Sequence, residues 1–210
     1  MAEVERKKSK KRGKTATDIV TVFVLSITAV LTAWCGFESS KWGGEMSIAF
    51  SQASSARIQA AAAEGEARDA RQFDLTIYTQ WVLAVADERP QLAAYIEERF
   101  TPHFAAAFDA WEADGRAEAG PFVTEAYVPP GSERAAEMTE RADAKFAEAL
   151  ENNQRGDNYS LLTVLFALVL FLTAMSQREM PVWIRRVLLG MAIGVGTVGL
   201  VIMLTFPIKI

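Results

Sequence analysis

The sequence has very few of the side chains that most often carry chemistry. Its 210 residues include one cysteine, Cys35, and one histidine, His103. A single cysteine excludes an intramolecular disulfide, and no Cys/His cluster suggests a structural metal. His103 follows Pro102 at an expected helix start, so we expect a structural or exposed histidine and not a catalytic one. We therefore predict no metal and no cofactor.

Nucleotide-binding and nucleophilic motifs are also missing from the chain. No G-x-G-x-x-G or phosphate-binding loop occurs. With one histidine and one cysteine, no Ser–His–acid set or metal pair can be assembled except through carboxylates. The acidic residues are spread along the expected helix faces, as they are on solvated surfaces. The sequence predicts a protein that is not an enzyme and that binds no nucleic acid.

Three long apolar stretches stand out, at residues 19–37, 161–175 and 187–206. About 20 apolar residues in a helix cross the hydrocarbon core of a bilayer, which is about 30 Å thick. We therefore predict three transmembrane helices, over residues 17–37, 159–177 and 187–206. The first apolar region is too long for a cleaved signal peptide, and no small-x-small site follows it. We expect it to be an uncleaved anchor.

Charge is segregated along the chain, and this predicts its orientation. Residues 6–14 hold seven of the 22 basic residues, and residues 38–158 hold 22 of the 26 acidic residues against 11 basic ones, a net charge of −11. Cytoplasmic flanks attract Lys and Arg, so we expect the basic arm, residues 1–16, and the connection 178–186 in the cytoplasm. Residues 38–158 and the tail 207–210 then lie outside the cytoplasm.

The region between the first two spans has helical periodicity. Met46 and a series of alanines recur at spacings of three and four up to Ala70, which is a heptad pattern of more than three repeats. A second alanine pattern with a spacing of seven runs through residues 132–158. We predict an all-α fold: three transmembrane helices and a helical, antiparallel coiled-coil-like extracytoplasmic domain with long helices at about 45–86 and 132–158. Residues 90–127 form a cap of short helices and loop.

A dense polar run, residues 152–159, directly precedes the second span and should face residues 37–42 at the same depth. This juxtamembrane cluster is our candidate interaction site. It is expected either to bind a ligand or partner, or to lock the two helices together, and the lock is the favoured alternative. Its members are Trp34, Phe37, Glu38, Lys41, Trp42, Asn152, Asn153, Arg155, Asp157, Asn158 and Tyr159.

The third span is rich in glycine. Gly190 and Gly194 form a G-x-x-x-G pair, and Gly196 and Gly199 follow them. Small residues let transmembrane helices approach closely, so this span is predicted either to pack against the other two spans or to contact another subunit. The expected partners are the lipid bilayer and a second copy of the chain or another membrane protein.

Parts of the sequence resemble an uncharacterised family of small bacterial inner-membrane proteins. Residues 32–42, TAWCGFESSKW, match a T-A-W-x-G-[YF]-[QE]-x-x-x-W signature at the end of the first span. The runs NQRGDNY at 153–159 and RFTPHF at 99–104 are similar to further motifs of the group. The resemblance covers most of residues 30–175. It implies a multi-pass protein of the bacterial inner membrane with the same topology, residues 38–158 being periplasmic, and it implies no particular activity.

These observations favour a non-enzymatic membrane protein that acts through protein–protein contacts, as a scaffold, an assembly factor or an accessory subunit. One alternative is a membrane sensor that binds a ligand in the helical cap or in the juxtamembrane cluster. A weaker alternative is an oligomeric channel. No ionisable group lies near the middle of a span, and a polar stripe of Thr21, Thr28 and Thr32 is more simply explained by helix packing.

Overall fold

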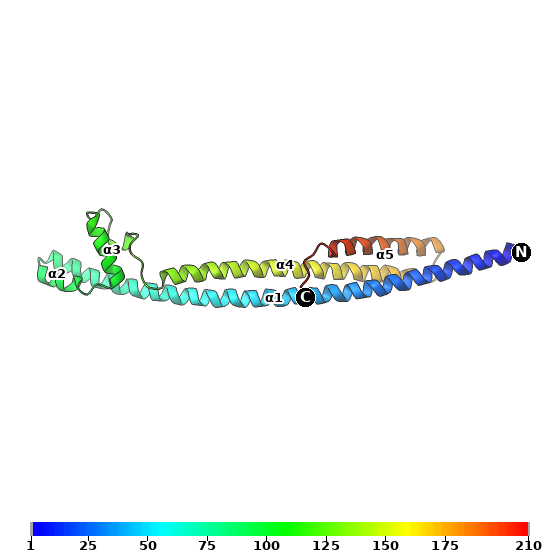
Figure 1. Ribbon diagram of the computed structural model, residues 1–210, viewed down its shortest axis with the longest axis horizontal. Coiled ribbons are helices and arrows are strands. Elements are labelled where there is room, and N and C mark those ends of the chain that lie inside the picture. Colours follow the sequence, from blue (N-terminus) through cyan, green and yellow to red (C-terminus); the bar gives the residue numbers. More distant parts are fainter. Residues whose placement is uncertain (1, 210) are drawn as a thin grey trace. The chain divides into compact units, whose positions relative to one another are not determined.

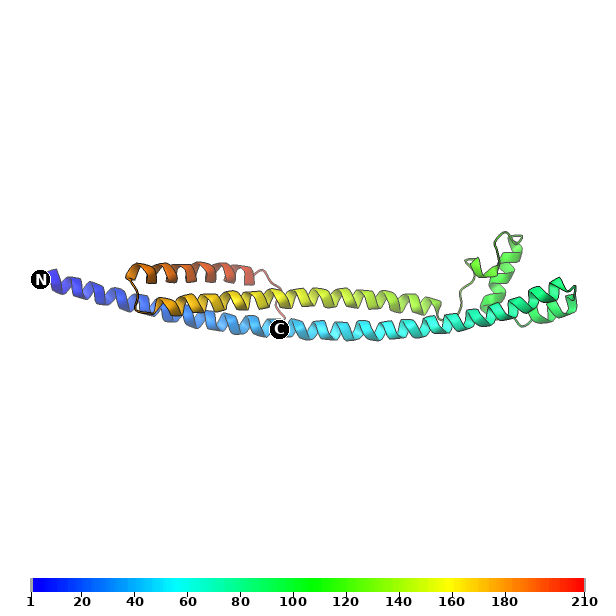
Figure 2. The same ribbon diagram turned by 180° about the vertical axis from the view of Figure 1, so that it is seen from behind.

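A computed structural model describes residues 2–209, with side chains from residue 18 onward. The side chains of the predicted basic arm, residues 1–16, therefore lie outside the described part. Within residues 2–209 the chain is helical and contains no strand (Figure 1 and Figure 2). The elements are α1 (Ala2–Ala86), α2 (Pro90–Glu97), α3 (Pro102–Ala113), the 3-10 turn η1 (Pro121–Val123), α4 (Ser132–Ser176) and α5 (Val182–Met203). The predicted all-α class is confirmed.

Three of these helices are long and apolar enough to cross a membrane. They are α1, α4 and α5, each with an 18-residue window of mean hydropathy between 2.0 and 2.1. The span expected at 17–37 falls within α1, the one at 159–177 extends one residue beyond α4, and the one at 187–206 extends three residues beyond α5. The helix bounds differ from the expected span limits mainly at the third one, since α5 begins at Val182 and ends at Met203.

Prolines mark where the shorter elements begin. Pro90, Pro102 and Pro121 stand at the first turns of α2, α3 and η1. Proline is favoured there because its fixed φ suits the helix and the first turn needs no backbone N–H donor. Pro181 directly precedes α5 in an extended conformation. The sequence thus separates its helices with residues that cannot continue one.

The chain divides into two compact units, which are described separately. The first unit comprises residues 1–49 and 147–210, and the second comprises residues 50–146. In the first unit, α5 lies alongside α4, as both ribbon views show. Phe166 and Val169 of α4 and Ala192 of α5 have no exposed surface. This packing forms the apolar centre between two of the helices that are long and apolar enough to cross a membrane.

In the second unit, α1 and α4 run in opposite directions. The Phe50 and Phe146 rings lie 5.5 Å apart, and the Arg57 guanidinium is 3.5 Å from the Asp143 carboxylate. Buried alanines face each other along this pair. They are Ala53, Ala56, Ala60 and Ala63 on α1 and Ala135 and Ala142 on α4. Their small side chains allow the two backbones to approach closely.

Gly131 fixes the place where α4 begins. Its φ is +89°, and a Cβ atom there would lie 2.4 Å from the carbonyl oxygen of Ala63. Only glycine tolerates both the left-handed conformation and the contact. Because α4 starts beside Ala63, the later members of the alanine pattern, Ala67 and Ala70, are only half-buried.

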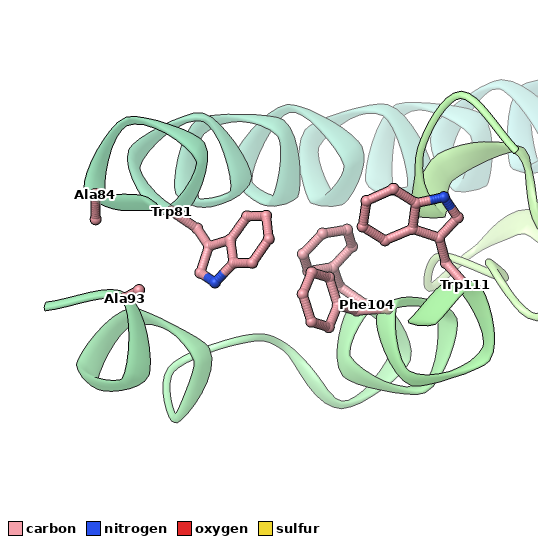
Figure 3. Packing of buried hydrophobic residues seen from close by; sticks show 6 residues of the cluster. Trp81, Ala84, Ala93, Phe104 and Trp111 are labelled. Atoms are coloured by element: carbon pink, nitrogen blue, oxygen red, sulfur yellow. The ribbon is translucent and has the colours of Figure 1, made fainter. Parts of the chain in front are cut away.

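The cap is built around aromatic side chains. Trp81 points from α1 toward α3, from which Phe104 and Trp111 point back (Figure 3). Trp81 meets Phe108 edge to face with 4.9 Å between ring centroids. The loop that follows α3 adds to this core, because η1 places Phe122 4.9 Å from Phe104. Buried aromatic pairs of this kind contribute about 0.5–1.5 kcal/mol each beyond the burial of their area.

Candidate functional site

The juxtamembrane cluster of the first unit is centred on Glu38. This side chain on α1 has no exposed surface, and Trp42, one turn further along, is 5% exposed. Tyr159 on α4 is also buried, at 1%. The Ser39 and Ser160 hydroxyls lie 2.8 Å apart and join the same two helices. The structure therefore brings residues 37–42 and 152–159 together, as the sequence predicts.

The cluster members fall into a buried and an exposed set. Glu38, Trp42, Asn152 and Tyr159 are buried, whereas Trp34, Phe37, Lys41, Asn153 and Asp157 are exposed. Much of the polar run pairs within α4. The Asn153 amide donates to the Asp157 carboxylate at 3.2 Å, and the Gln154 amide donates to Asn158 at 3.1 Å. This exposed set has the contacts of an ordinary solvated helix face.

Arg155 links the two sets. Its guanidinium pairs with Glu151 on its own helix and lies 4.7 Å from the centre of the Trp42 ring. A cation over an indole face is attracted by the ring quadrupole. Arg155 therefore covers one side of the buried tryptophan.

The segment after α5 completes the site, and sequence reasoning missed its role. The backbone N–H of Lys209 donates to Glu38 Oε2 at 2.9 Å, and its ammonium lies 3.3 Å from Glu45. The Tyr159 hydroxyl donates to the carbonyl oxygen of Pro207 at 3.1 Å. The sequence predicts the tail 207–210 only as a short extracytoplasmic end. The sequence holds one signal of this role, the isolated positive charge of Lys209, which can pair with Glu38 and Glu45.

Two buried polar atoms of the cluster have no hydrogen-bond partner among the described residues, namely Glu38 Oε1 and Trp42 Nε1. Buried polar groups are nearly always paired, and leaving one unpaired costs roughly 1–3 kcal/mol. One atom accepts a hydrogen bond and the other donates one. The hydrogen bonding of this buried site is therefore incomplete among the described residues.

A second buried carboxylate lies in the cap, on Asp74 of α1, and it has no exposed surface. The Thr101 hydroxyl donates to Oδ1 at 2.7 Å, and the Tyr127 hydroxyl donates to Oδ2 at 2.9 Å. His103 Nε2 is 2.7 Å from Oδ2. Because a carboxylate accepts, Nε2 carries the proton in this contact. Asp74 thus ties α1 to the start of α3 and to the loop before α4.

The geometry of this network differs from that of a nucleophile triad. A nucleophile triad needs the hydroxyl and the acid on opposite nitrogens of the imidazole. Here Thr101 and Asp74 both lie next to Nε2, and the Thr101 hydroxyl donates to the acid itself. This supports a structural role for His103. Sequence reasoning did not single out Asp74, which looks like any other acidic residue of the helix.

Burial of Tyr127 raises the pKa of its hydroxyl above the ordinary value of 10, and the hydrogen bond to Asp74 adds to the shift. Among the described residues, no three His, Cys, Asp or Glu side chains gather where a metal ion could bind.

The four glycines of α5 have two different environments. A Cβ atom on Gly199 would lie 3.0 Å from Leu165 and Phe166, and one on Gly196 would lie 3.6 Å from Val169. Gly190 and Gly194 face open space. Half of the glycine pattern therefore packs within the chain, and the other half is available to a neighbour.

Of the threonines considered for a polar stripe, Thr28 lines a small and mainly apolar cavity. Thr21 and Thr28 are buried, and the Thr32 hydroxyl donates to the Thr28 carbonyl of its own helix at 2.7 Å. A cavity of about 180 Å³ between α1, α4 and α5 is lined mainly by apolar residues such as Ile27, Phe166 and Leu200. These contacts are those of helix packing.

Comparison with known proteins adds no relative. No protein-family model matches the chain, and neither a curated protein nor a solved structure matches it.

Proposed function

We propose that this chain is a non-enzymatic membrane protein that acts through protein–protein contacts, as a scaffold, assembly factor or accessory subunit. In this proposal it associates with a second copy through α5. The observation that carries the proposal is the open space at Gly190 and Gly194, in contrast to Gly196 and Gly199 on the same helix. A membrane helix surface with two glycines one turn apart permits close backbone approach by another helix.

The residues around Gly190 and Gly194 support the proposal that this side of α5 contacts another helix. Val187, Met191, Val198 and Val201 are all at least half exposed and follow the glycines along one side of α5. This side of α5 is therefore apolar, and at the two glycines no side chain projects from it. In a bilayer such a surface contacts lipid or another helix. The two glycines at its centre favour a helix, because they permit close backbone approach.

We further propose that residues 38–158 are extracytoplasmic and the basic arm is cytoplasmic, as the distribution of Lys and Arg favours. The juxtamembrane cluster then acts as a lock between α1, α4 and the tail. The burial of Glu38, Trp42 and Tyr159 supports a lock over an open ligand site.

Crosslinking in native membranes tests the self-association. Met191→Cys and Leu161→Cys introduce thiols at apolar positions that are 52% and 69% exposed, on α5 and α4 respectively. We expect an oxidant to produce a disulfide-linked dimer from Met191→Cys and little from the Leu161→Cys control. Adding Gly194→Leu to Met191→Cys should abolish the dimer, because the larger side chain separates the helices. Equal crosslinking at both positions, or none at Met191, would contradict the proposed face.

The orientation has a separate test at Ala113, an exposed residue at the end of α3. Ala113→Cys in intact cells should react with a membrane-impermeant maleimide added from outside. If the thiol reacts only after the cytoplasmic side is opened to the reagent, the proposed topology is inverted.

A further inference from the structure

Two tryptophans of the cap share a single positive charge. The guanidinium carbon of Arg116 lies 5.6 Å from the ring centre of Trp81 and 5.2 Å from that of Trp111. Tyr78 lies next to both indoles, stacked on Trp81 at 5.7 Å and edge to face with Trp111 at 6.4 Å. Rings within about 6 Å of a cation attract it through their negative faces. The cap therefore contains an aromatic cation site that its own arginine occupies.

The rings are held in place without help from Arg116. The Trp81 indole N–H donates to the Glu97 carboxylate at 2.5 Å, and the Trp111 indole N–H donates to the Glu118 carbonyl at 2.8 Å. Both side chains are more than 90% buried in the cap core. Their orientation comes from α2 and from the loop after α3, so the site is pre-organised for a cation.

Arg116 itself is held weakly. Its φ is +62°, directly after Gly115 at +69°, and the strain of a non-glycine residue in this left-handed region, roughly 1–2 kcal/mol, is the same wherever the side chain points. Its side chain is half exposed, and its salt bridge is to Glu112, one turn back and also partly exposed. Exposed pairs of this kind contribute little. The side chain can therefore leave the rings at a small cost.

The electrostatic setting favours another cation in its place. When Arg116 moves away, the Glu112 carboxylate at the edge of the site loses its partner and becomes available as a counterion. The second unit, residues 50–146, holds 17 acidic and nine basic residues, a net charge of −8, which raises the local concentration of cations. Both indole N–H groups already donate hydrogen bonds to the cap, so the two rings can offer a ligand only their π faces. This suits a cation that needs no hydrogen bonds.

We propose that Trp81 and Trp111, with Tyr78 packed against them, form a binding site for a small quaternary ammonium compound, and that Arg116 is a built-in occupant which the ligand displaces. The proposal goes beyond the scaffold function and does not depend on self-association through α5.

Tryptophan fluorescence of the full-length protein in detergent tests this proposal. Tetramethylammonium chloride is titrated against sodium chloride at the same ionic strength, with Trp183→Phe in every variant to reduce the background from α5. Arg116→Gly removes the occupant and suits the left-handed backbone. We expect it to bind tetramethylammonium about tenfold more tightly than the parent, since a competing cation–π contact is lost. Arg116→Lys, which keeps a cation, should stay close to the parent.

The double variant Arg116→Gly/Trp111→Leu provides the specificity control and should lose the response. A folded Arg116→Gly protein, judged by near-UV circular dichroism, that shows no response specific to tetramethylammonium would overturn the proposal. An unchanged response in the double variant would do the same. If neither Arg116→Gly nor Arg116→Ala folds, Arg116 is required by the cap and is not a displaceable occupant, which also refutes the proposal.

Discussion

Glu38 and Asp74 are both carboxylates on α1 with no exposed surface, yet they are satisfied in different ways. Asp74, in the cap, receives hydrogen bonds from Thr101, His103 and Tyr127. Glu38, in the first unit, receives one from the backbone of Lys209, and its Oε1 has no partner among the described residues. Asp74 therefore belongs to a completed hydrogen-bond network, whereas the contact of Glu38 depends on the short segment after α5.

The difference in partners has an energetic meaning. A hydrogen bond to a charged group contributes about 1.5–3 kcal/mol, and breaking a buried network leaves its remaining members unpaired. Asp74 draws its donors from α3 and from the loop before α4, so removing its charge affects the whole cap. Among the described residues Glu38 has a single donor, so its replacement affects mainly the tail.

The largest effect is expected at Asp74. Asp74→Asn keeps the shape but removes the charge and turns an amide N–H₂ group toward donors. We expect the free energy of unfolding of the cap to fall by about 3 kcal/mol. Hydrogen exchange of the amides in residues 90–127 measures this. Asp109→Asn, at an exposed position of α3, is the matched control and should change nothing; equal effects of the two variants would show that Asp74 holds no network.

A smaller effect is expected from Tyr127→Phe, which removes one of the three donors. At neutral pH the cap should lose about 1.5 kcal/mol of stability, again measured by hydrogen exchange. A loss as large as that of Asp74→Asn would mean that Tyr127 alone carries the network.

The same variant has a pH-dependent consequence. The pKa of Tyr127 is raised in the fold, so its proton leaves the unfolded chain first as pH rises. The folded state then binds more protons, and stability falls as pH increases beyond about 10. Tyr127→Phe should remove this part of the alkaline loss in a thermal unfolding series from pH 9 to 11. Parallel curves for the parent and the variant would contradict the assignment.

The smallest effect is expected at Glu38. Glu38→Gln keeps an oxygen that can accept from Lys209 and loses a charge that few groups stabilise. We expect a change below about 1 kcal/mol in the thermal stability of the first unit. A loss comparable to that of Asp74→Asn would show that Oε1 has a strong partner in the native membrane.

The features that follow from local sequence were predictable. The length of an apolar stretch sets whether a helix crosses a bilayer, and this identified the three long helices. Spacings of three and four placed Ala53, Ala56, Ala60 and Ala63 on one face, and all four are buried. These properties depend on each residue's near neighbours along the chain.

The features that depend on distant partners were not predictable. Lys209 and Glu38 are 171 residues apart in the sequence, and nothing local pairs them. Asp74 is recognisable as buried only once Thr101, His103 and Tyr127 are placed around it. Likewise, Gly190 and Gly199 look equivalent in the sequence, and only the position of α4 distinguishes the packed glycine from the open one.

The burial of Cys35 has a practical consequence. It is the only cysteine of the chain, it has no exposed surface, and its sulfur lies 3.8 Å from that of Met203 near the end of α5. A thiol placed at any exposed position can therefore be labelled selectively in the natural sequence, without first removing a competing cysteine. Cys35 itself becomes a built-in reporter: its reaction with a small maleimide would record the moments when the end of α5 separates from α1.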